Sequence, residues 1–219
     1  ELAPLEIMLL LRGAAEVVTP RSTSVPLMGE AMGHVERHPN ADVLVDDGLI
    51  LEIGQNLDAP DSQILDVSGK VIVPGFVDPH THLVWSGSRE HELEWKLQGR
   101  SYQEILADGG GILRTVKETR SASEEELQAE SLIRFKNAIK HGSTTIEIKS
   151  GYGLDKETEL KQLHVAKWLG SLGLAEVVVT FMGAHALPEG TDRRAYVSHV
   201  LEMLDEVQDL AEFCDVFCE

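Results

Sequence analysis

The chain has 219 residues, with 37 acidic and 19 basic side chains, which gives a formal net charge of -18. Binding a phosphate backbone needs clustered Lys and Arg, so this excess of carboxylates argues against a nucleic-acid partner. No apolar run approaches membrane-spanning length, and Cys214 and Cys218 are expected to be reduced core residues. These features predict a cytoplasmic protein without membrane contact.

Residues 1–70 contain short strand-like runs and no helical period. The runs lie at residues 6–12, 42–46, 49–53 and 63–67. Between the second and third runs, Asp47-Gly48 predicts a tight two-residue hairpin. Residues 20–40 are rich in Pro, Gly, Ser and His without periodicity, which predicts a loop. We expect a small β-domain over residues 1–70.

From Val71 onward, apolar strands alternate with amphipathic helices. Strands are expected at residues 71–77, 144–149, 176–182 and 213–218. Helices are expected at residues 124–140, 155–170 and from about 192. The first of these helices opens with a capping box formed by Ser123 and Glu126. Four parallel βα units follow from this order, as half of an eight-stranded barrel or as an open four-stranded sheet.

The segment VPGFVDPHTH, residues 73–82, ends in two histidines that are two positions apart. On an extended chain such side chains share a face, so Asp78, His80 and His82 project together from the end of the strand. Two imidazoles in this arrangement can bind one cation such as zinc. The alternative is a pair of exposed loop histidines, which the apolar strand before them and the in-phase Asp78 disfavour.

Charged residues interrupt the strand at residues 144–149. Ile146 and Ile148 alternate there with Glu147 and Lys149, although both faces of a strand in a parallel α/β core are normally apolar. If the isoleucines meet the helices, the charged pair points into a barrel interior, where it must be paired. The pair then belongs to a polar site or is a purely structural ion pair.

Three further residues follow the ends of expected strands. Arg89 comes after the first strand, Tyr152 after the second and His185 after the third. The carboxyl ends of parallel strands carry the chemistry of barrels and open α/β sheets, so these residues are expected to meet at one edge. Arg89 is a candidate clamp for a substrate carboxylate, with a surface ion pair as the alternative. Tyr152 and His185 could instead be surface or structural residues.

The segment at residues 74–82 resembles the first metal-binding strand of the amidohydrolase superfamily. A narrower match, to members that open an imidazolone ring in histidine degradation, runs from about residue 42 to the end. It is carried by residues 85–90, 109–112, 147–154, 157–161, 183–186 and 215–219.

The resemblance implies an amidohydrolase-type (β/α)8 TIM barrel, represented at residues 71–219 by about its first four βα units. Beside it, residues 1–70 would contribute to a small β-sandwich. The implied reaction is hydrolysis of 4-imidazolone-5-propanoate to N-formimidoyl-L-glutamate with one zinc or iron ion. The implied metal ligands are His80 and His82, the substrate-binding residues are Arg89, Tyr102, Tyr152 and His185, and His185 is also the catalytic candidate.

In such enzymes the remaining metal ligands come from later strands. The resemblance therefore predicts that this chain is the amino-terminal portion of a protein about twice as long, inactive as written, with a small molecule as its substrate. Many such barrels pair, so a homodimer is a further expectation. Two alternatives stay open: another amidohydrolase, such as a cyclic-amide hydrolase or deaminase, and a non-catalytic α/β binding domain.

Overall fold

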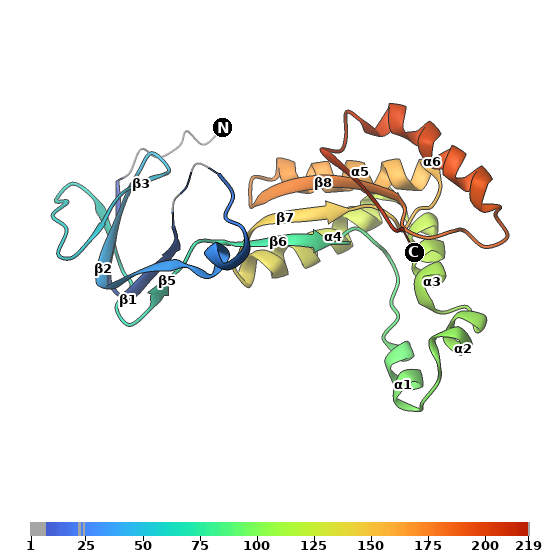
Figure 1. Cartoon of the computed structure of the whole chain (residues 1–219), viewed down its shortest axis with the longest axis horizontal. Coiled ribbons are helices and arrows are strands. Elements are labelled where there is room, and N and C mark those ends of the chain that lie inside the picture. The colour runs from blue at the N-terminus through green and yellow to red at the C-terminus, as the bar shows by residue number, and fades with distance from the viewer. Residues whose placement is uncertain (1–7, 22, 24, 219) are drawn as a thin grey trace. The chain divides into compact units, whose positions relative to one another are not determined.

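The computed structural model describes residues 8–21, 23 and 25–218, which fall into two compact units that divide after Pro74 (Figure 1). The first unit is a sheet with the strand order β3-β2-β1-β4, in which β5 also pairs with β1. Its strands are β1 (Leu9–Pro20), β2 (Val35–Asp46), β3 (Leu49–Gly54), β4 (Gln63–Asp66) and β5 (Val71–Ile72). A 3-10 turn, η1 (Gly29–Gly33), lies between β1 and β2.

The first unit confirms the expected hairpin and corrects the expected loop. Asp47 and Gly48 both have positive φ, 47° and 73°, as a tight turn between β2 and β3 requires. In contrast, residues 35–40 belong to β2, and β1 continues to Pro20, which pairs with Val35. Most side chains of β2 over residues 35–40 are exposed, so this strand lacks the apolar alternation that marks a strand in sequence. Glu6 and Ile7, the start of the first predicted strand, lie outside the described residues.

The second unit is a mixed α/β structure built on a four-stranded parallel sheet. The strands follow one another in chain order as β6 (Phe76–Thr81), β7 (Ser143–Lys149), β8 (Glu176–Ala184) and β9 (Phe213–Val216). The helices are α1 (His91–Leu97), α2 (Tyr102–Ala107), α3 (Gly111–Ser121), α4 (Glu124–Lys140), α5 (Lys156–Ser171) and α6 (Arg193–Val207). The larger apolar core is formed by the sheet with α3, α4, α5 and α6 and includes Phe135, Ile146, Ile148, Leu163 and Met203.

Four helices of the second unit, α2, α4, α5 and α6, begin at side-chain caps. The hydroxyl of Ser123 accepts the N–H of Glu126 at 3.2 Å, and the Glu126 carboxylate accepts the N–H of Ser123 at 2.8 Å, which confirms the predicted capping box of α4. The carboxylates of Asp155 and Asp192 cap α5 and α6 in the same position. None of the helices in the described part of the chain is long and apolar enough to span a bilayer.

Two expectations about the second unit were wrong. Residues 71–77 are not one strand: β5 ends at Ile72 in the first unit, and β6 begins at Phe76. Pro74 and Gly75 separate them, and Gly75 packs so closely on β7 that a Cβ there would clash with Thr144. Cys214 and Cys218 are exposed rather than buried. Cys214 lies in β9, which is the edge strand of the described sheet, and Cys218 follows that strand.

Candidate functional site

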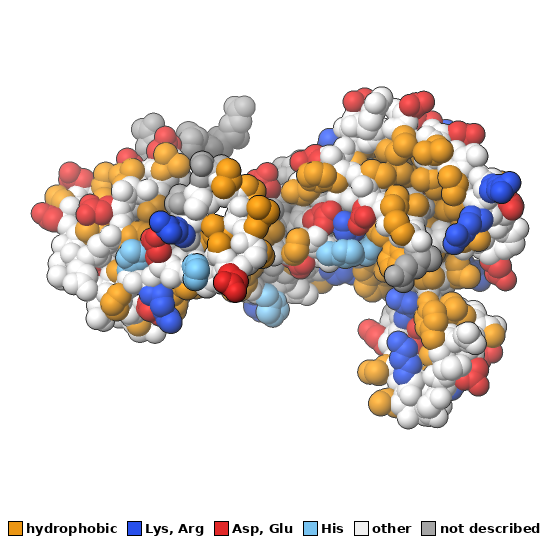
Figure 2. All heavy atoms as spheres, viewed as in Figure 1, with side chains coloured by type: hydrophobic (Ala, Val, Ile, Leu, Met, Phe, Trp, Pro, Cys, Tyr) orange, Lys and Arg blue, Asp and Glu red, His pale blue; other side chains and the backbone are white. Residues whose placement is uncertain are grey.

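Aromatic side chains from three successive strands meet at the carboxyl ends of β6, β7 and β8. His82 follows β6, Tyr152 follows β7 and His185 follows β8. The rings of His82 and His185 stack with centroids 4.4 Å apart and planes 9° apart, and the Tyr152 ring lies 5.1 Å from His82 and 5.5 Å from His185. On the face in Figure 2, histidine side chains of the second unit gather beside acidic and basic ones.

His80 lies at the outer side of this cluster. Its ring is edge-on to His82, with centroids 5.7 Å apart, and the side chain is exposed. The structure thus brings together four of the residues singled out in the sequence: His80, His82, Tyr152 and His185.

Two neighbouring carbonyl groups of the loop after β7 orient the stacked imidazoles. His82 Nδ1 donates to the carbonyl oxygen of Ser150 at 2.8 Å, and His185 Nδ1 donates to that of Gly151 at 2.9 Å. A carbonyl oxygen can only accept, so both rings carry their proton on Nδ1. Both therefore present the lone pair of Nε2, which is the state that binds a metal ion or takes up a proton.

Burial keeps both rings neutral. Burial, reinforced by the nearby His185, His80 and Lys149, lowers the pKa of His82 to about 4, although the hydrogen bond to Ser150 opposes it. Burial also lowers the pKa of His185. The Tyr152 phenol has a raised pKa for the same reason, so it stays protonated and can donate a hydrogen bond.

Arg89 and Tyr102 come from the segment between β6 and α3. Arg89 is partly buried and lies near enough to Tyr152 for its positive charge to oppose the rise of the Tyr152 pKa. Tyr102 is the first residue of α2, where its side chain is 53% exposed and its hydroxyl points toward Gly111 at the start of α3. The charge of Arg89 therefore acts on Tyr152, whereas Tyr102 stands on a separate helix.

The charged residues of β7 form a polar network on the sheet face opposite the isoleucines. Lys149 Nζ lies 2.8 Å from a Glu147 carboxylate oxygen and 3.0 Å from one of Asp215. Thr180 also donates to Glu147, at 2.5 Å. Burial alone would lower the pKa of Lys149, but its hydrogen bonds to the two carboxylates raise it. Ile146 and Ile148 meet the helices, as the sequence predicts.

Sequence reasoning missed two buried residues of α5 that hold the loop after β7. Glu159 accepts the N–H groups of Gly151, Gly153 and Leu154 at 2.8–3.0 Å, and Gln162 accepts the N–H of Tyr152 at 3.2 Å. Burial raises the pKa of Glu159, and the hydrogen bonds that it accepts oppose this rise. The sequence does carry one sign of this role: both polar residues fall on the same helix face as the apolar residues of α5, which predicts that they are buried and hydrogen-bonded.

The donors present fit part of a metal site. His82 is neutral and offers Nε2, and the imidazole of His80 is adjacent. Within residues 8–218, apart from the undescribed positions 22 and 24, no group of three or more His, Cys, Asp or Glu side chains is placed to hold a metal ion. The two imidazoles can therefore supply two ligands of a set that needs further donors.

Comparison with known proteins identifies a relative over nearly the whole chain, although no protein-family model matches it. A curated imidazolonepropionase from Staphylococcus aureus (strain bovine RF122 / ET3-1) is 44% identical over 213 residues, which is 96% of this chain and 52% of that protein. The chain thus spans about half the length of the curated relative that it matches. This similarity confirms the resemblance inferred from the motifs.

Solved structures share the fold at much lower identity. A 5-methylcytosine deaminase from Klebsiella pneumoniae matches 97% of this chain and 51% of its own, with a TM-score of 0.57 and 17% identity. An N-isopropylammelide isopropylaminohydrolase from Burkholderia multivorans matches 95% of this chain and 44% of its own, with a TM-score of 0.56 and 20% identity. These likenesses show that the chain shares the fold of about half of each of these two proteins, and they say nothing about the substrate.

Proposed function

We propose that this chain corresponds to the amino-terminal half of a metal-dependent hydrolase that opens 4-imidazolone-5-propanoate to N-formimidoyl-L-glutamate in the cytoplasm. The observation that carries the proposal is the meeting of His82, Tyr152 and His185 at the ends of three successive strands. The similarity to a curated imidazolonepropionase supports the same reaction.

We also propose that the four-stranded sheet is half of a (β/α)8 barrel, and that the first unit is part of a β-sandwich. The parallel strands follow one another in chain order, whereas a doubly wound open sheet reverses its order at a switch point. The charged face formed by Glu147, Lys149 and Asp215 would then line the barrel interior.

The proposed reaction assigns a task to each residue of the site. His80 and His82 would hold the ion through imidazole nitrogens, of which Nε2 of His82 is free. When bound, zinc or iron at this place lowers the pKa of water and polarises a carbonyl group. The neutral Nε2 of His185 can take up a proton and return it to the ring nitrogen that leaves. The protonated Tyr152 hydroxyl can donate to the substrate ring.

Specificity for a carboxylate-bearing ring would come from Arg89. A guanidinium binds a carboxylate by two parallel hydrogen bonds, and the charge of this one acts on Tyr152 of the cluster. Tyr102, on α2, would add a contact from the same segment of chain.

The test compares the complete protein with its Arg89→Ala variant on two substrates. With 4-imidazolone-5-propanoate, we expect KM to rise about 10–100-fold, because charge-assisted hydrogen bonds to the carboxylate are lost. With an imidazolone that lacks the propanoate, the variant should behave like the wild type. Equal effects on both rings would instead favour another cyclic-amide hydrolase or a deaminase. No turnover and no stoichiometric metal would favour a non-catalytic binding domain.

A further inference from the structure

Two consecutive peptide groups after β7 each lie between a side chain of α5 and an imidazole of the site. In the first, the N–H of Gly151 donates to Glu159 Oε2 at 3.0 Å, and the carbonyl of Ser150 accepts from His82 at 2.8 Å. In the second, the N–H of Tyr152 donates to Gln162 at 3.2 Å, and the carbonyl of Gly151 accepts from His185 at 2.9 Å. Each peptide group thus donates its N–H to a side chain of α5 and accepts a hydrogen bond from an imidazole through its carbonyl.

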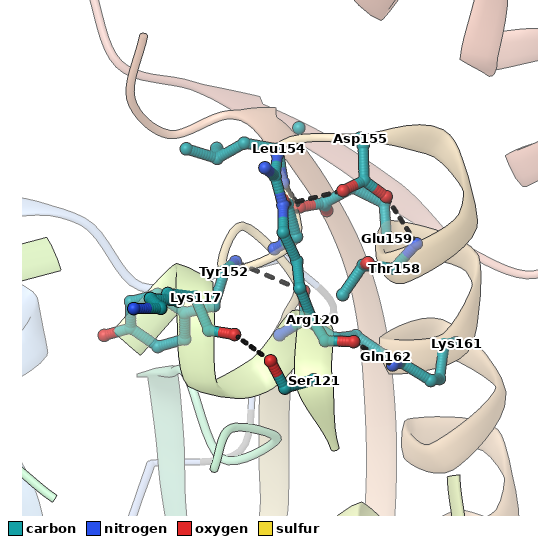
Figure 3. A network of polar contacts seen from close by, with 12 residues as sticks. Lys117, Arg120, Ser121, Tyr152, Leu154, Asp155, Thr158, Glu159, Lys161 and Gln162 are labelled. Atoms are coloured by element: carbon teal, nitrogen blue, oxygen red, sulfur yellow. Dashed lines mark hydrogen bonds and ion pairs between the residues drawn. The ribbon is translucent and has the colours of Figure 1, made fainter. Parts of the chain in front are cut away.

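We propose that Glu159 and Gln162 are positioning residues, which set the ring orientation and the Nδ1–H tautomer of His82 and His185 through these two peptide groups. The inference rests on the proposed function only in that the two imidazoles are taken to serve hydrolysis. The two side chains are three residues apart on α5, so they share the helix face that meets the loop. Figure 3 shows them beside the loop that carries Tyr152 and Leu154.

Both side chains are fixed by further hydrogen bonds, so neither is free to turn. The second carboxylate oxygen of Glu159 accepts the N–H groups of Gly153 and Leu154, each at 2.8 Å. The amide nitrogen of Gln162 donates to the carbonyl of Val84 at 2.6 Å, which ties the loop after β7 to the chain after β6. Their side chains are 0% and 1% exposed, respectively.

The loop is packed closely between α5 and the site. Gly151 has a φ of +109°, and a Cβ on it would lie 2.9 Å from the carbonyl oxygen of Met182 and from the His185 ring. A Cβ on Gly153 would lie 2.6 Å from the backbone nitrogen of Glu159. The loop backbone therefore packs closely against α5 on one side and against His185 on the other. We expect a change in the contacts with α5 to move the loop and, with it, the imidazole rings.

The first test replaces Glu159 by Gln in the complete protein. The amide oxygen can still accept from Gly153 and Leu154, but the amide N–H₂ then faces the N–H of Gly151, so this peptide group must turn away from His82. Mutation of such an outer partner typically weakens metal binding or activity 10–100-fold. We expect a loss of this size in zinc retention against a chelator and in kcat, with KM nearly unchanged. Glu157→Gln is the matched control, because it removes an exposed carboxylate from the same turn of α5.

The second test uses Gln162→Met, which keeps the volume and removes both hydrogen bonds. The tautomer of His185 is read by nitrogen NMR in the zinc-loaded complete protein, a measurement that does not depend on turnover. The wild type should show only the Nδ1–H form, and the variant should populate Nε2–H as well. Gln162→Glu keeps the acceptor for Tyr152 but replaces the donor to the Val84 carbonyl, so it should restore the Nδ1–H form only where its carboxyl group is protonated.

The proposal is overturned if folded Glu159→Gln retains wild-type zinc affinity, or if folded Gln162→Met keeps a single Nδ1–H tautomer at His185. Should one variant fail to fold, the other decides the question by its own measurement. If the tautomer and metal affinity shift as expected while the wild type does not hydrolyse the imidazolone, the positioning role stands and the proposed function fails.

Discussion

At the scale of single residues, the sequence indicated which side chains meet but not what orients them. His80, His82, Tyr152 and His185 could be singled out because each follows the end of an expected strand, and parallel strands end at one edge of a sheet. The carbonyls of Ser150 and Gly151, which fix the imidazole tautomers, belong to the backbone of a loop. The orientation of carbonyl groups in a loop depends on tertiary contacts, here those with Glu159 and Gln162. No pattern of residues in the sequence predicts that orientation.

The lowered pKa of His82 predicts a loss of stability in acid. The unfolded chain protonates this imidazole below pH 6.5, whereas the folded chain does so only near pH 4. The free energy of unfolding is therefore not reduced by His82 above pH 6.5. It falls as the pH decreases from 6.5 toward 4, and the total loss from this residue is at most about 3 kcal/mol. Denaturant unfolding of the metal-free protein at pH 7 and pH 4.5 measures this loss.

His82→Asn is the matched comparison, since its amide can still donate to the Ser150 carbonyl but does not titrate. Its free energy of unfolding should fall about 2 kcal/mol less than that of the wild type between the two pH values. Identical pH dependence of the two proteins would show that His82 is not held neutral by the fold.

At the scale of elements, capping signals located helices well, and exposed strands were the weak point. The capping box at Ser123 fixed the start of α4, and the predicted helix at residues 124–140 matches the observed bounds. The composition of the polar amino-terminal part of β2 predicts a loop, but pairing with β1 makes this segment a strand. The predicted strand at residues 71–77 is two strands, separated at Pro74 and Gly75. Gly75 packs closely on Thr144, a tertiary contact that the sequence does not reveal.

The capping box predicts a measurable contribution of one hydroxyl to stability. Ser123→Ala removes the acceptor for the N–H of Glu126 and should lower the free energy of unfolding by about 1 kcal/mol. Ser198→Ala, at an exposed position inside α6, is the control and should change it by less than about 0.5 kcal/mol. Equal effects of the two changes in denaturant unfolding would contradict a capping role.

The charged face of β7 and its neighbours predicts a strong dependence on Lys149. Lys149→Met leaves the Glu147 carboxylate without its cation, and breaking such a buried pair should cost about 3 kcal/mol. The double variant Lys149→Met/Glu147→Gln also removes the Glu147 charge and should recover part of that loss, since the more exposed Asp215 stays unpaired. Thermal or denaturant unfolding of the three proteins checks this, and a cost below about 1 kcal/mol for the single variant would mean that solvent screens the pair.

At the scale of the whole molecule, the order of strands and helices was the most predictable feature. The alternation of apolar and amphipathic segments indicated the four parallel strands, and their sequence in the sheet follows the chain. The sequence placed the change from β-rich to α/β structure near residue 70, and the two compact units divide after Pro74. No bounds were predicted for the three helices between Arg89 and α4, although Ser101 and Glu104 form a capping box at the start of α2 and α3 is amphipathic.

The most direct test of the account is the position of the metal ion in crystals of the complete protein, located by anomalous scattering at the zinc or iron edge. We predict one ion about 2.0–2.1 Å from Nε2 of His82 if it is zinc, with His80 as a second ligand, because Nδ1 of His82 donates to Ser150. An ion bound away from this pair, or bound through Nδ1 of His82, would contradict it.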